Sequence, residues 1–316
     1  MCAIYGFLNY GNKVHHRTLL KLIRELSIAA ECRGTDATGI SYNKGSEMIT
    51  FKKAKPAHKL HLYFPHGTKA VIGHNRMTTQ GSEKMNYNNH PFPGKTNDHA
   101  FALAHNGVLY NDTEVKAQYK LPDTPIETDS YVAVQMLEQY KTIDSSTLKE
   151  VSEAVRGSFV FTVLRDDNTL FLVRGNNPIT LYYYPELGLY VYASTKEILD
   201  KALKLCCIKG YPISYKINEG DIVRIDADGK ISVTQFTMDV QDPWLDLWKY
   251  YRSSWMPEDD ICSAEILDIC GYYGIEKEDV VLLLSVGYTV DEIEEMLADT
   301  DYFEAAINEA KTLYEQ

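Results

Sequence analysis

The N-terminal segment, residues 1–7 with the sequence MCAIYGF, constrains this chain more than any other stretch. If the initiator methionine is removed, a cut that the small side chain of Cys2 suits, one residue carries both a thiol and a free α-amino group. Thiols attack as thiolates, and an α-amino group with a pKa of about 7.7–8.0 can serve as the base that takes the thiol proton. N-terminal nucleophiles of this kind form a known class of covalent catalyst. The alternative is that Cys2 is an ordinary small apolar residue.

The composition excludes several classes of protein. Of the 316 residues 45% are apolar, enough for a large core in one extended domain or in one domain plus an appendage. The formal net charge of −12 argues against a general nucleic-acid binder. No apolar run approaches the roughly 20 residues of a membrane span, and no signal-peptide pattern is found. We therefore expect neither a nucleic acid nor a membrane as a partner.

The six cysteines predict a reducing compartment. They form no CxxC pair, and the adjacent Cys206 and Cys207 have poor geometry for a shared metal or a disulfide. The sequence also lacks the GxGxxG and GxxxxGK[ST] nucleotide motifs. We expect a cytoplasmic protein with no metal and no cofactor. A mechanism that needs Cys2 at the mature terminus also excludes a cleaved targeting peptide.

The charge is unevenly spread along the chain. Residues 242–316 hold 19 acidic and 4 basic side chains, whereas residues 1–241 hold 25 acidic and 28 basic ones. This break in composition predicts a domain boundary near residue 242, between a domain at 1–241 and an acidic module at 242–316.

Hydrophobic periodicity predicts an α+β domain over residues 1–241. Helices are expected at residues 17–31, 131–140, 147–155 and 195–204, and strands at residues 2–9, 40–42, 48–52, 69–74, 100–104, 158–165, 169–174, 180–184, 189–193, 213–216, 221–225 and 231–236. Because these elements come in blocks, without strict βαβ alternation, we expect layers of largely antiparallel sheet with helices outside. Residues 33–39 read as a turn, and Thr128 or Asp129 as the N-cap of the helix that begins at residue 131.

The tail shows helical spacing throughout. Helices are expected at residues 264–272, 277–285, 290–298 and 303–314. Residues 285–292 resemble a helix–turn–helix corner, but a DNA reader needs a basic face and this segment is acidic. We interpret the tail as a small all-α module for docking or stability. The alternative is that it only makes the protein more soluble.

Several side chains of the first domain suit the hydrolysis of an amide. Cys2 is the candidate nucleophile, and the side-chain amide of Asn106 beside the backbone N–H of Gly107 can stabilise an oxyanion. An amino-acid substrate needs a cation for its carboxylate, which Arg76 offers, and an anion for its ammonium, which Asp129 offers. The alternatives are a surface ion pair for Arg76, a helix cap for Asp129, and a hairpin turn for Asn106 and Gly107.

Six motifs carry a resemblance to a known family over roughly residues 2–236. They are MCAIYG (1–6), RGTDATG (33–39), GHNR (73–76) with Thr79 and Gly81, NHPF (89–92), HNGVLYN (105–111) and TDS (128–130), with weaker matches at Arg174-Gly175 with Pro178 and at Ala193-Ser194. In this order they resemble the class II glutamine amidotransferase domain of the N-terminal-nucleophile hydrolase superfamily. The resemblance implies an αββα sandwich, in which two antiparallel sheets lie between helical layers. It also implies hydrolysis of glutamine to glutamate and ammonia through a γ-glutamyl thioester on Cys2.

The resemblance also implies roles for individual residues. Asn106 and Gly107 correspond to the oxyanion hole, and Arg33 supports the surroundings of the nucleophile. For the substrate, Arg76 and Thr79 would hold the α-carboxylate. Asp129, together with Gly107, would hold the α-ammonium.

The loop over residues 76–84 corresponds to a lid that closes over glutamine. This chain departs from the family there, because Met77 stands where some relatives carry an aromatic residue and Gln80 where His or Ala is frequent. Both are expected to be supporting residues of the lid, with Met77 packing over the thioester. Tyr131 follows Ser130 where several relatives have Glu or Thr, and this leaves the role of Asp129 unchanged.

No ammonia-consuming synthase is evident in the sequence. Residues 242–316 hold neither a sugar isomerase nor a phosphoribosyltransferase motif, and no SGGxDS loop. We therefore expect glutamine as the substrate and a separate synthase subunit that docks on the C-terminal helices. The oligomeric state stays open. The alternatives are an amidase for another γ-glutamyl or amide substrate, and a non-catalytic regulatory subunit that binds glutamine.

Overall fold

The computed structural model describes residues 2–238 and, nearer the C-terminus, residues 279, 280, 282, 283, 286, 288, 292, 293, 296 and 300–314. The chain divides into two compact units, residues 1–247 and 248–316. The domain boundary predicted near residue 242 and the helix predicted at 264–272 lie outside the described residues.

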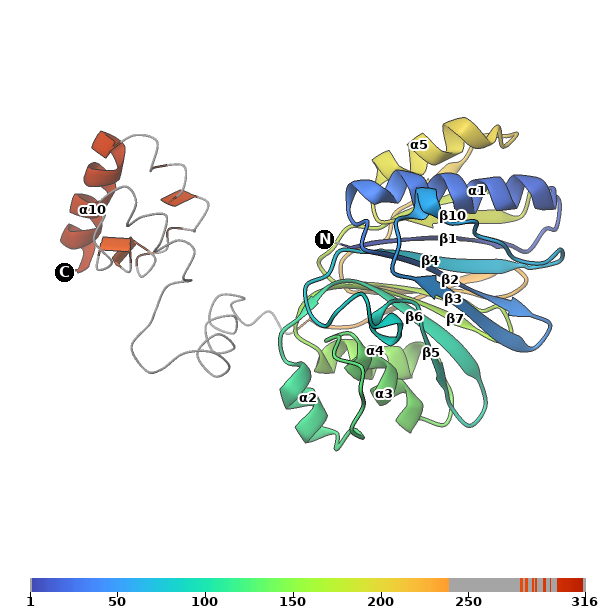
Figure 1. Ribbon diagram of the computed structural model, residues 1–316, viewed down its shortest axis with the longest axis horizontal. Helices are drawn as coiled ribbons and strands as arrows, with labels where there is room; N and C mark the ends of the chain where they lie inside the picture. The colour runs from blue at the N-terminus through green and yellow to red at the C-terminus, as the bar shows by residue number, and fades with distance from the viewer. Residues whose placement is uncertain are drawn as a thin grey trace. The chain divides into compact units, whose positions relative to one another are not determined.

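Two antiparallel sheets form the centre of the first unit. The seven-stranded sheet has the order β11-β9-β10-β1-β4-β2-β3, and the six-stranded sheet the order β13-β12-β8-β7-β6-β5. The strands are β1 (Ala3–Asn9), β2 (Ala37–Lys44), β3 (Glu47–Lys53), β4 (Ala70–Arg76), β5 (Phe92–Lys95), β6 (Ala100–Leu109), β7 (Gly157–Arg165), β8 (Leu170–Arg174), β9 (Thr180–Tyr184), β10 (Leu189–Ala193), β11 (Ile213–Tyr215), β12 (Asp221–Ile225) and β13 (Ile231–Gln235). The sheets face each other, and helices cover their outer sides (Figure 1).

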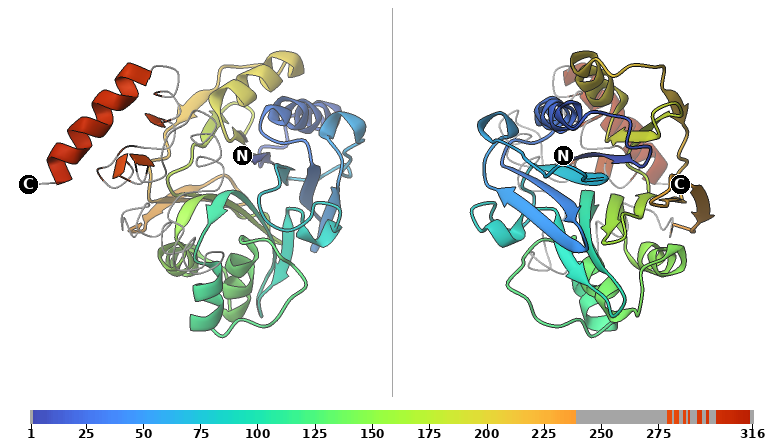
Figure 2. Two further views of the ribbon diagram at one scale, coloured as in Figure 1. Left: turned by 60° about the vertical axis from the view of Figure 1, so that its left-hand side comes forward. Right: turned by 90° about the vertical axis from the view of Figure 1, so that its right-hand side faces the viewer.

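The helices form two separate layers. Helices α1 (His16–Ala29) and α5 (Lys196–Cys206) pack side by side on the seven-stranded sheet, whereas α3 (Tyr131–Gln139) and α4 (Ser145–Ala154) lie on the six-stranded sheet (Figure 1, Figure 2). The short helix α2 (Asp112–Gln118) precedes α3. This arrangement confirms the predicted αββα sandwich of two antiparallel sheets.

Strand β1 shows how the sequence forms the two cores. Side chains alternate across a strand, so Ala3, Tyr5 and Phe7 pack beneath the helices while Ile4 and Leu8 pack between the sheets. All five are fully buried. Because both faces of the strand are covered, it carries apolar side chains on both, and this fixes the chain terminus in the middle of a sheet.

The structure corrects two boundaries. Residues 33–39 were expected to form a turn, but β2 already begins at Ala37. Strand β6 was expected to end at residue 104 and to deliver Asn106 and Gly107 to a loop, but it continues to Leu109. Asn106 lies opposite Val160 of β7, so the hairpin-turn alternative for this pair is wrong.

Two further corrections concern short elements. Strand β5 and helix α2 were not predicted, because each is too short to show a clear period. The N-cap of α3 is Ser130 rather than Thr128 or Asp129, and no side-chain cap bond forms there.

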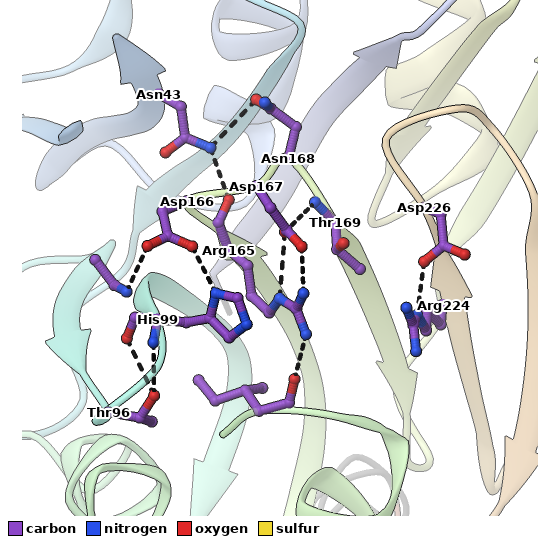
Figure 3. Close-up of polar contacts among 12 residues, drawn as sticks. Asn43, Thr96, His99, Arg165, Asp166, Asp167, Asn168, Thr169, Arg224 and Asp226 are labelled. Atoms are coloured by element: carbon purple, nitrogen blue, oxygen red, sulfur yellow. Dashed lines mark hydrogen bonds and ion pairs between the residues drawn. The ribbon is translucent and has the colours of Figure 1, made fainter. Parts of the chain in front are cut away.

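A polar network ties the two sheets together at one end (Figure 3). The Asn43 side chain, from β2, donates to the backbone oxygen of Arg165 at the end of β7, with 2.6 Å between the atoms. The Arg165 guanidinium pairs with Asp167 and donates to the backbone oxygen of Ile143 at 2.7 Å. Arg165 lies opposite Phe101 of β6. Phe101 comes six residues before Gly107 on the same strand, so these two residues are about 20 Å apart.

Replacing Arg165 by alanine is expected to lower the free energy of unfolding by about 2–3 kcal/mol, the usual cost of losing buried hydrogen bonds to a charged group. The Arg165 side chain is only 9% exposed, so water does not replace these contacts easily. Urea unfolding measures the loss. Arg224→Ala is the matched control, because its ion pair with Asp226 is about one-third exposed and should contribute less than about 1 kcal/mol. Equal losses in the two variants would contradict the claim that the buried contacts of Arg165 stabilise the fold more than the partly exposed ion pair of Arg224.

The described residues of the second unit include helix α10 (Thr300–Tyr314), which confirms the helix predicted at residues 303–314. Its apolar side chains Phe303, Ala306, Ile307 and Ala310 form a buried cluster with four earlier residues, which are Val280, Leu283, Ile293 and Met296. The helices predicted at 277–285 and 290–298 and the corner at 285–292 lie partly outside the described residues. The all-α character of the tail therefore stays a prediction. In the part of the chain that is described, no helix has the length and apolar character needed to cross a bilayer.

Candidate active site

Cys2 lies at the N-terminal end of β1, against the backbone of Met77. The Cys2 Sγ is 3.4 Å from both the Met77 N and the Met77 O. The Arg33 Nε donates to the Cys2 backbone oxygen at 2.8 Å. Because β1 runs antiparallel to β4, with Ala3 opposite Asn75, the first residues of β1 lie beside the last residues of β4. This pairing brings residues 2 and 77 together.

Arg76, the last residue of β4, is almost fully buried and organises the loop that follows. Its Nη1 donates to the Asn89 Oδ1 at 2.8 Å, and its Nη2 donates to the backbone oxygens of Gln80 and Gly81 at 2.5 and 3.1 Å. The surface-ion-pair alternative for Arg76 is therefore wrong. The guanidinium folds the chain after β4 around itself.

A close backbone approach holds the base of this loop. A Cβ on Gly34 would lie 2.5 Å from the backbone carbon of Arg76, so only glycine fits there. The Asp36 carboxylate then accepts the Thr78 N–H at 2.7 Å. The segment between α1 and β2 thereby fixes the position of Met77, the residue that touches the Cys2 thiol.

Asn106 and Gly107 belong to the other sheet. Gly107 has φ +147°, and a Cβ there would lie 1.8 Å from the Ser158 backbone oxygen, so the β6–β7 pairing requires glycine. The Asn106 side chain is fully buried, and its Oδ1 has no hydrogen-bond partner among the described residues. The Asn177 Nδ2 donates to the Asn106 backbone oxygen at 3.0 Å. A buried amide with one unpaired atom is a feature expected of a group that awaits a ligand.

Asp129 is buried beside the end of β6. Its Oδ2 accepts the Leu109 N–H at 2.6 Å, and its Oδ1 accepts the Ser130 hydroxyl at 3.3 Å. These bonds replace the expected helix cap and hold an almost fully buried carboxylate in one orientation. Such a carboxylate suits a cationic group of a ligand.

Charges at the site act on the Cys2 thiol. Burial raises the pKa of Cys2 above its ordinary value, while the Met77 N–H and the charge of Arg76 lower this pKa and the charge of Asp129 raises it. The two charged residues on which the sequence hypothesis rests therefore lie near the sulfur. Because burial dominates, the resting thiol is protonated at neutral pH and needs a base to become a nucleophile.

Alkylation of Cys2 by iodoacetamide is expected to be slower at pH 7 than that of a free peptide thiol, whose pKa is about 8.5. The rate should rise roughly tenfold per pH unit and continue to rise above pH 9, because only the thiolate reacts. Peptide mass spectrometry follows the modification of Cys2, with the urea-unfolded chain as the control. A rate that becomes constant below pH 8 would show a lowered pKa instead.

The remaining predicted residues lie in the loop that follows β4. The Thr79 and Met77 side chains are exposed, whereas Gln80 is half-buried. Burial raises the pKa of Asp112, a residue that sequence reasoning missed, and the charge of Asp129 raises it further.

Sequence reasoning also missed a group of basic side chains behind Arg76. Lys52 donates to the Asn89 backbone oxygen at 2.6 Å, and burial, with a smaller effect of Arg76, lowers its pKa to about 8. His74, His90 and His105 are buried together, and burial lowers their pKa values. The signal was present, since these histidines belong to the GHNR, NHPF and HNG motifs. Among the described residues, no cluster of His, Cys, Asp and Glu is arranged to hold a metal.

Two comparisons with solved structures agree with the fold. The chain superposes on glutamine phosphoribosylpyrophosphate amidotransferase from B. subtilis with a TM-score of 0.58 at 19% identity, covering 75% of this chain and 50% of that one. It superposes on the allosteric regulatory enzyme of purine biosynthesis with a TM-score of 0.60 at 17% identity, covering 76% and 50%. At these identities the likeness shows the fold alone, a sandwich of two antiparallel sheets.

Sequence comparison identifies the family. A model described as a glutamine amidotransferase domain matches residues 74–201. The 7-cyano-7-deazaguanine synthase of Sulfolobus acidocaldarius is 27% identical over 210 residues, 63% of this chain and 44% of that protein. The glutamine–fructose-6-phosphate aminotransferase (isomerizing) of Staphylococcus aureus is 30% identical over 249 residues, which are 72% of this chain and 39% of that protein. The chain spans less than half the length of these relatives, and it carries a class II glutamine amidotransferase domain.

Proposed function

We propose that this domain hydrolyses L-glutamine to glutamate and ammonia through a thioester on Cys2. The observation that carries the proposal is the meeting of Cys2 with the charges of Arg76 and Asp129 at one end of the sandwich. A cation and an anion at a fixed separation suit the zwitterionic end of an amino acid, and a nearby thiol suits attack on its side-chain amide. The proposal requires that Cys2 is the first residue of the mature chain.

The reaction proceeds in two halves. The α-amino group of Cys2 takes the thiol proton, and the thiolate attacks the γ-carbonyl carbon of glutamine. The oxyanion that forms is stabilised by the Asn106 side-chain amide and the Gly107 N–H. When the C–N bond breaks, the amino group returns the proton to the leaving ammonia. Water then attacks the thioester, releasing glutamate and restoring the thiol.

Arg76 and Thr79 are the proposed ligands of the α-carboxylate, and Asp129 with Gly107 those of the α-ammonium. The three contacts of the Arg76 guanidinium use three of its five N–H groups. A carboxylate can bind one of the remaining two, or it can replace the backbone oxygens of Gln80 and Gly81 at Nη2. In the second case, binding releases these carbonyls and rearranges the loop that carries Met77, so substrate binding and lid position are coupled.

The ammonia is proposed to pass to a synthase. The relatives, a 7-cyano-7-deazaguanine synthase and an aminotransferase, are longer than this chain. We propose that the acceptor is a separate cytoplasmic subunit that docks on the acidic C-terminal helices. The oligomeric state of this assembly stays open. The charge of residues 242–316 favours a basic partner surface. Co-purification with and without residues 242–316 tests the docking.

The deciding experiment is the intact mass and the N-terminal peptide mass before and after treatment with 6-diazo-5-oxo-norleucine, a glutamine-like electrophile. We expect a chain without Met1 and one stoichiometric adduct on Cys2. Excess glutamine should slow the labelling, because it competes for Arg76 and Asp129. A retained Met1, or an adduct that forms equally fast with and without glutamine, would contradict the proposal.

A further inference from the structure

Ser194, which directly follows β10, lies between the strand of the nucleophile and the strand of the oxyanion group. Its N–H donates to the Ile4 backbone oxygen at 2.9 Å, and its hydroxyl oxygen accepts the Ile4 N–H at 2.9 Å. The Asn106 Nδ2 lies 3.5 Å from the same hydroxyl oxygen. Ile4 is two residues after Cys2, and Asn106 belongs to the other sheet. One fully buried side chain thus contacts both halves of the site.

When the Asn106 amide points its nitrogen at the Ser194 hydroxyl, the proton of this hydroxyl lacks a good acceptor. The hydroxyl oxygen then accepts two N–H groups, and its own proton is directed to the Ile4 backbone oxygen at 3.4 Å. The Ile4 oxygen already accepts the Ser194 N–H, so the hydroxyl proton shares its acceptor with another donor. Meanwhile, the Asn106 Oδ1 stays buried without a partner among the described residues. A buried unpaired acceptor is costly.

A half-turn of the Asn106 amide gives the Ser194 hydroxyl proton an acceptor of its own, 3.5 Å away, and replaces the unpaired oxygen by a donor group that a ligand can meet. Oxygen and nitrogen of an amide have nearly the same shape, so their assignment follows from the hydrogen bonds around them. After the half-turn, the Oδ1 accepts the Ser194 hydroxyl proton, and the Nδ2 takes the place of the unpaired atom. An oxyanion requires a donor, and this orientation supplies one.

We propose that Ser194 is a positioning residue of the oxyanion hole. Its hydroxyl proton selects the orientation of Asn106 that presents the side-chain N–H groups to the oxyanion. By accepting the Ile4 N–H, the same hydroxyl sets this donor relative to the strand that carries Cys2. The inference rests on the proposed glutaminase function and adds a residue to its machinery.

Ser194→Ala is expected to lower kcat for glutamine hydrolysis about 10- to 100-fold, less than the 10²–10³ for deleting an oxyanion donor. KM for glutamine should stay within about twofold, because Arg76 and Asp129 are untouched. In the Asn106→Ala background, Ser194→Ala should cause no further loss, because no amide is left to orient. A purely structural role predicts equal losses in both backgrounds. That result, or an unchanged kcat, would overturn the proposal.

Ser152→Ala is the matched control. Ser152 is also a buried serine, and its hydroxyl donates to the Leu148 backbone oxygen at 2.7 Å within α4. This variant should show the wild-type kcat. It therefore separates the loss of a buried hydroxyl in general from the loss of the Asn106 contact.

An NMR measurement tests the same contact without turnover. The side-chain amide protons of Asn106 are identified by their absence in Asn106→Ala, and their nuclear Overhauser effect to the Ser194 β protons is measured. A weak effect supports the proposal, because the amide protons then point away from Ser194, and a strong effect overturns it. If the wild type and Cys2→Ala are equally inactive on glutamine, the proposed function fails, but this measurement still decides the orientation.

Discussion

Cys2→Ala is expected to lower the rate of glutamine hydrolysis on the order of 10⁴–10⁶-fold, the scale seen when a covalent nucleophile is removed. The Cys2 thiol lies against the Met77 backbone, where its Sγ is 3.4 Å from both N and O. Alanine leaves the β1 pairing with β4 and β10 intact, because these contacts use the backbone. Ammonia release measures the rate, and isothermal calorimetry measures glutamine binding, which should persist.

Cys32→Ala is the control for this experiment, since Cys32 is an exposed thiol in the short helical turn after α1. It should hydrolyse glutamine at the wild-type rate. Activity that survives in Cys2→Ala but not in Cys32→Ala would show that the nucleophile is Cys32. Loss of glutamine binding in Cys2→Ala would show that the variant has lost the structure of the site, and circular dichroism would detect the same defect.

Asn106→Ala is expected to lower kcat about 10²–10³-fold with little change in KM, because an oxyanion forms only during the reaction. The Gly107 N–H should account for part of the remaining rate. Steady-state kinetics at saturating glutamine measure the effect. A large rise in KM with unchanged kcat would instead make Asn106 a ligand of the bound substrate.

Asn43→Ala is the matched control for Asn106→Ala. Asn43 is likewise buried and has an unpaired Oδ1, but its Nδ2 bonds the backbone of Arg165 in the network at the other end of β7 (Figure 3). We expect Asn43→Ala to lower stability without changing kcat. Equal loss of kcat in both variants would mean that Asn106 acts through stability alone.

Much of the fold followed from local pattern. The apolar run of β1, the spacing of α1 and the run of strands after residue 157 predicted elements that the structure confirms. These elements are long or strongly periodic, so their hydrophobic faces are visible without knowledge of the partners. Strand β5 and helix α2 lack this property, and only their contacts with β6 and α3 stabilise them.

The position of the oxyanion pair shows where local pattern fails. Asn followed by Gly is the usual signal of a tight turn, but here both residues are paired within a sheet. The signal is ambiguous because glycine serves both a turn and a close approach of two backbones. Only the distance to Ser158, in a strand some 50 residues later in the sequence, distinguishes the two.

The sequence by itself determined the family, the αββα architecture and the identity of the candidate residues, because motif order and hydrophobic period are properties of the chain. Only the tertiary structure decided what each polar group contacts. It buried Arg76 among loop carbonyls, bonded Asp129 to the Leu109 N–H, and set Ser194 between Ile4 and Asn106. Hydrogen bonds depend on distances of a few tenths of an ångström between strands that are far apart in sequence. Such distances are fixed when the two sheets pack.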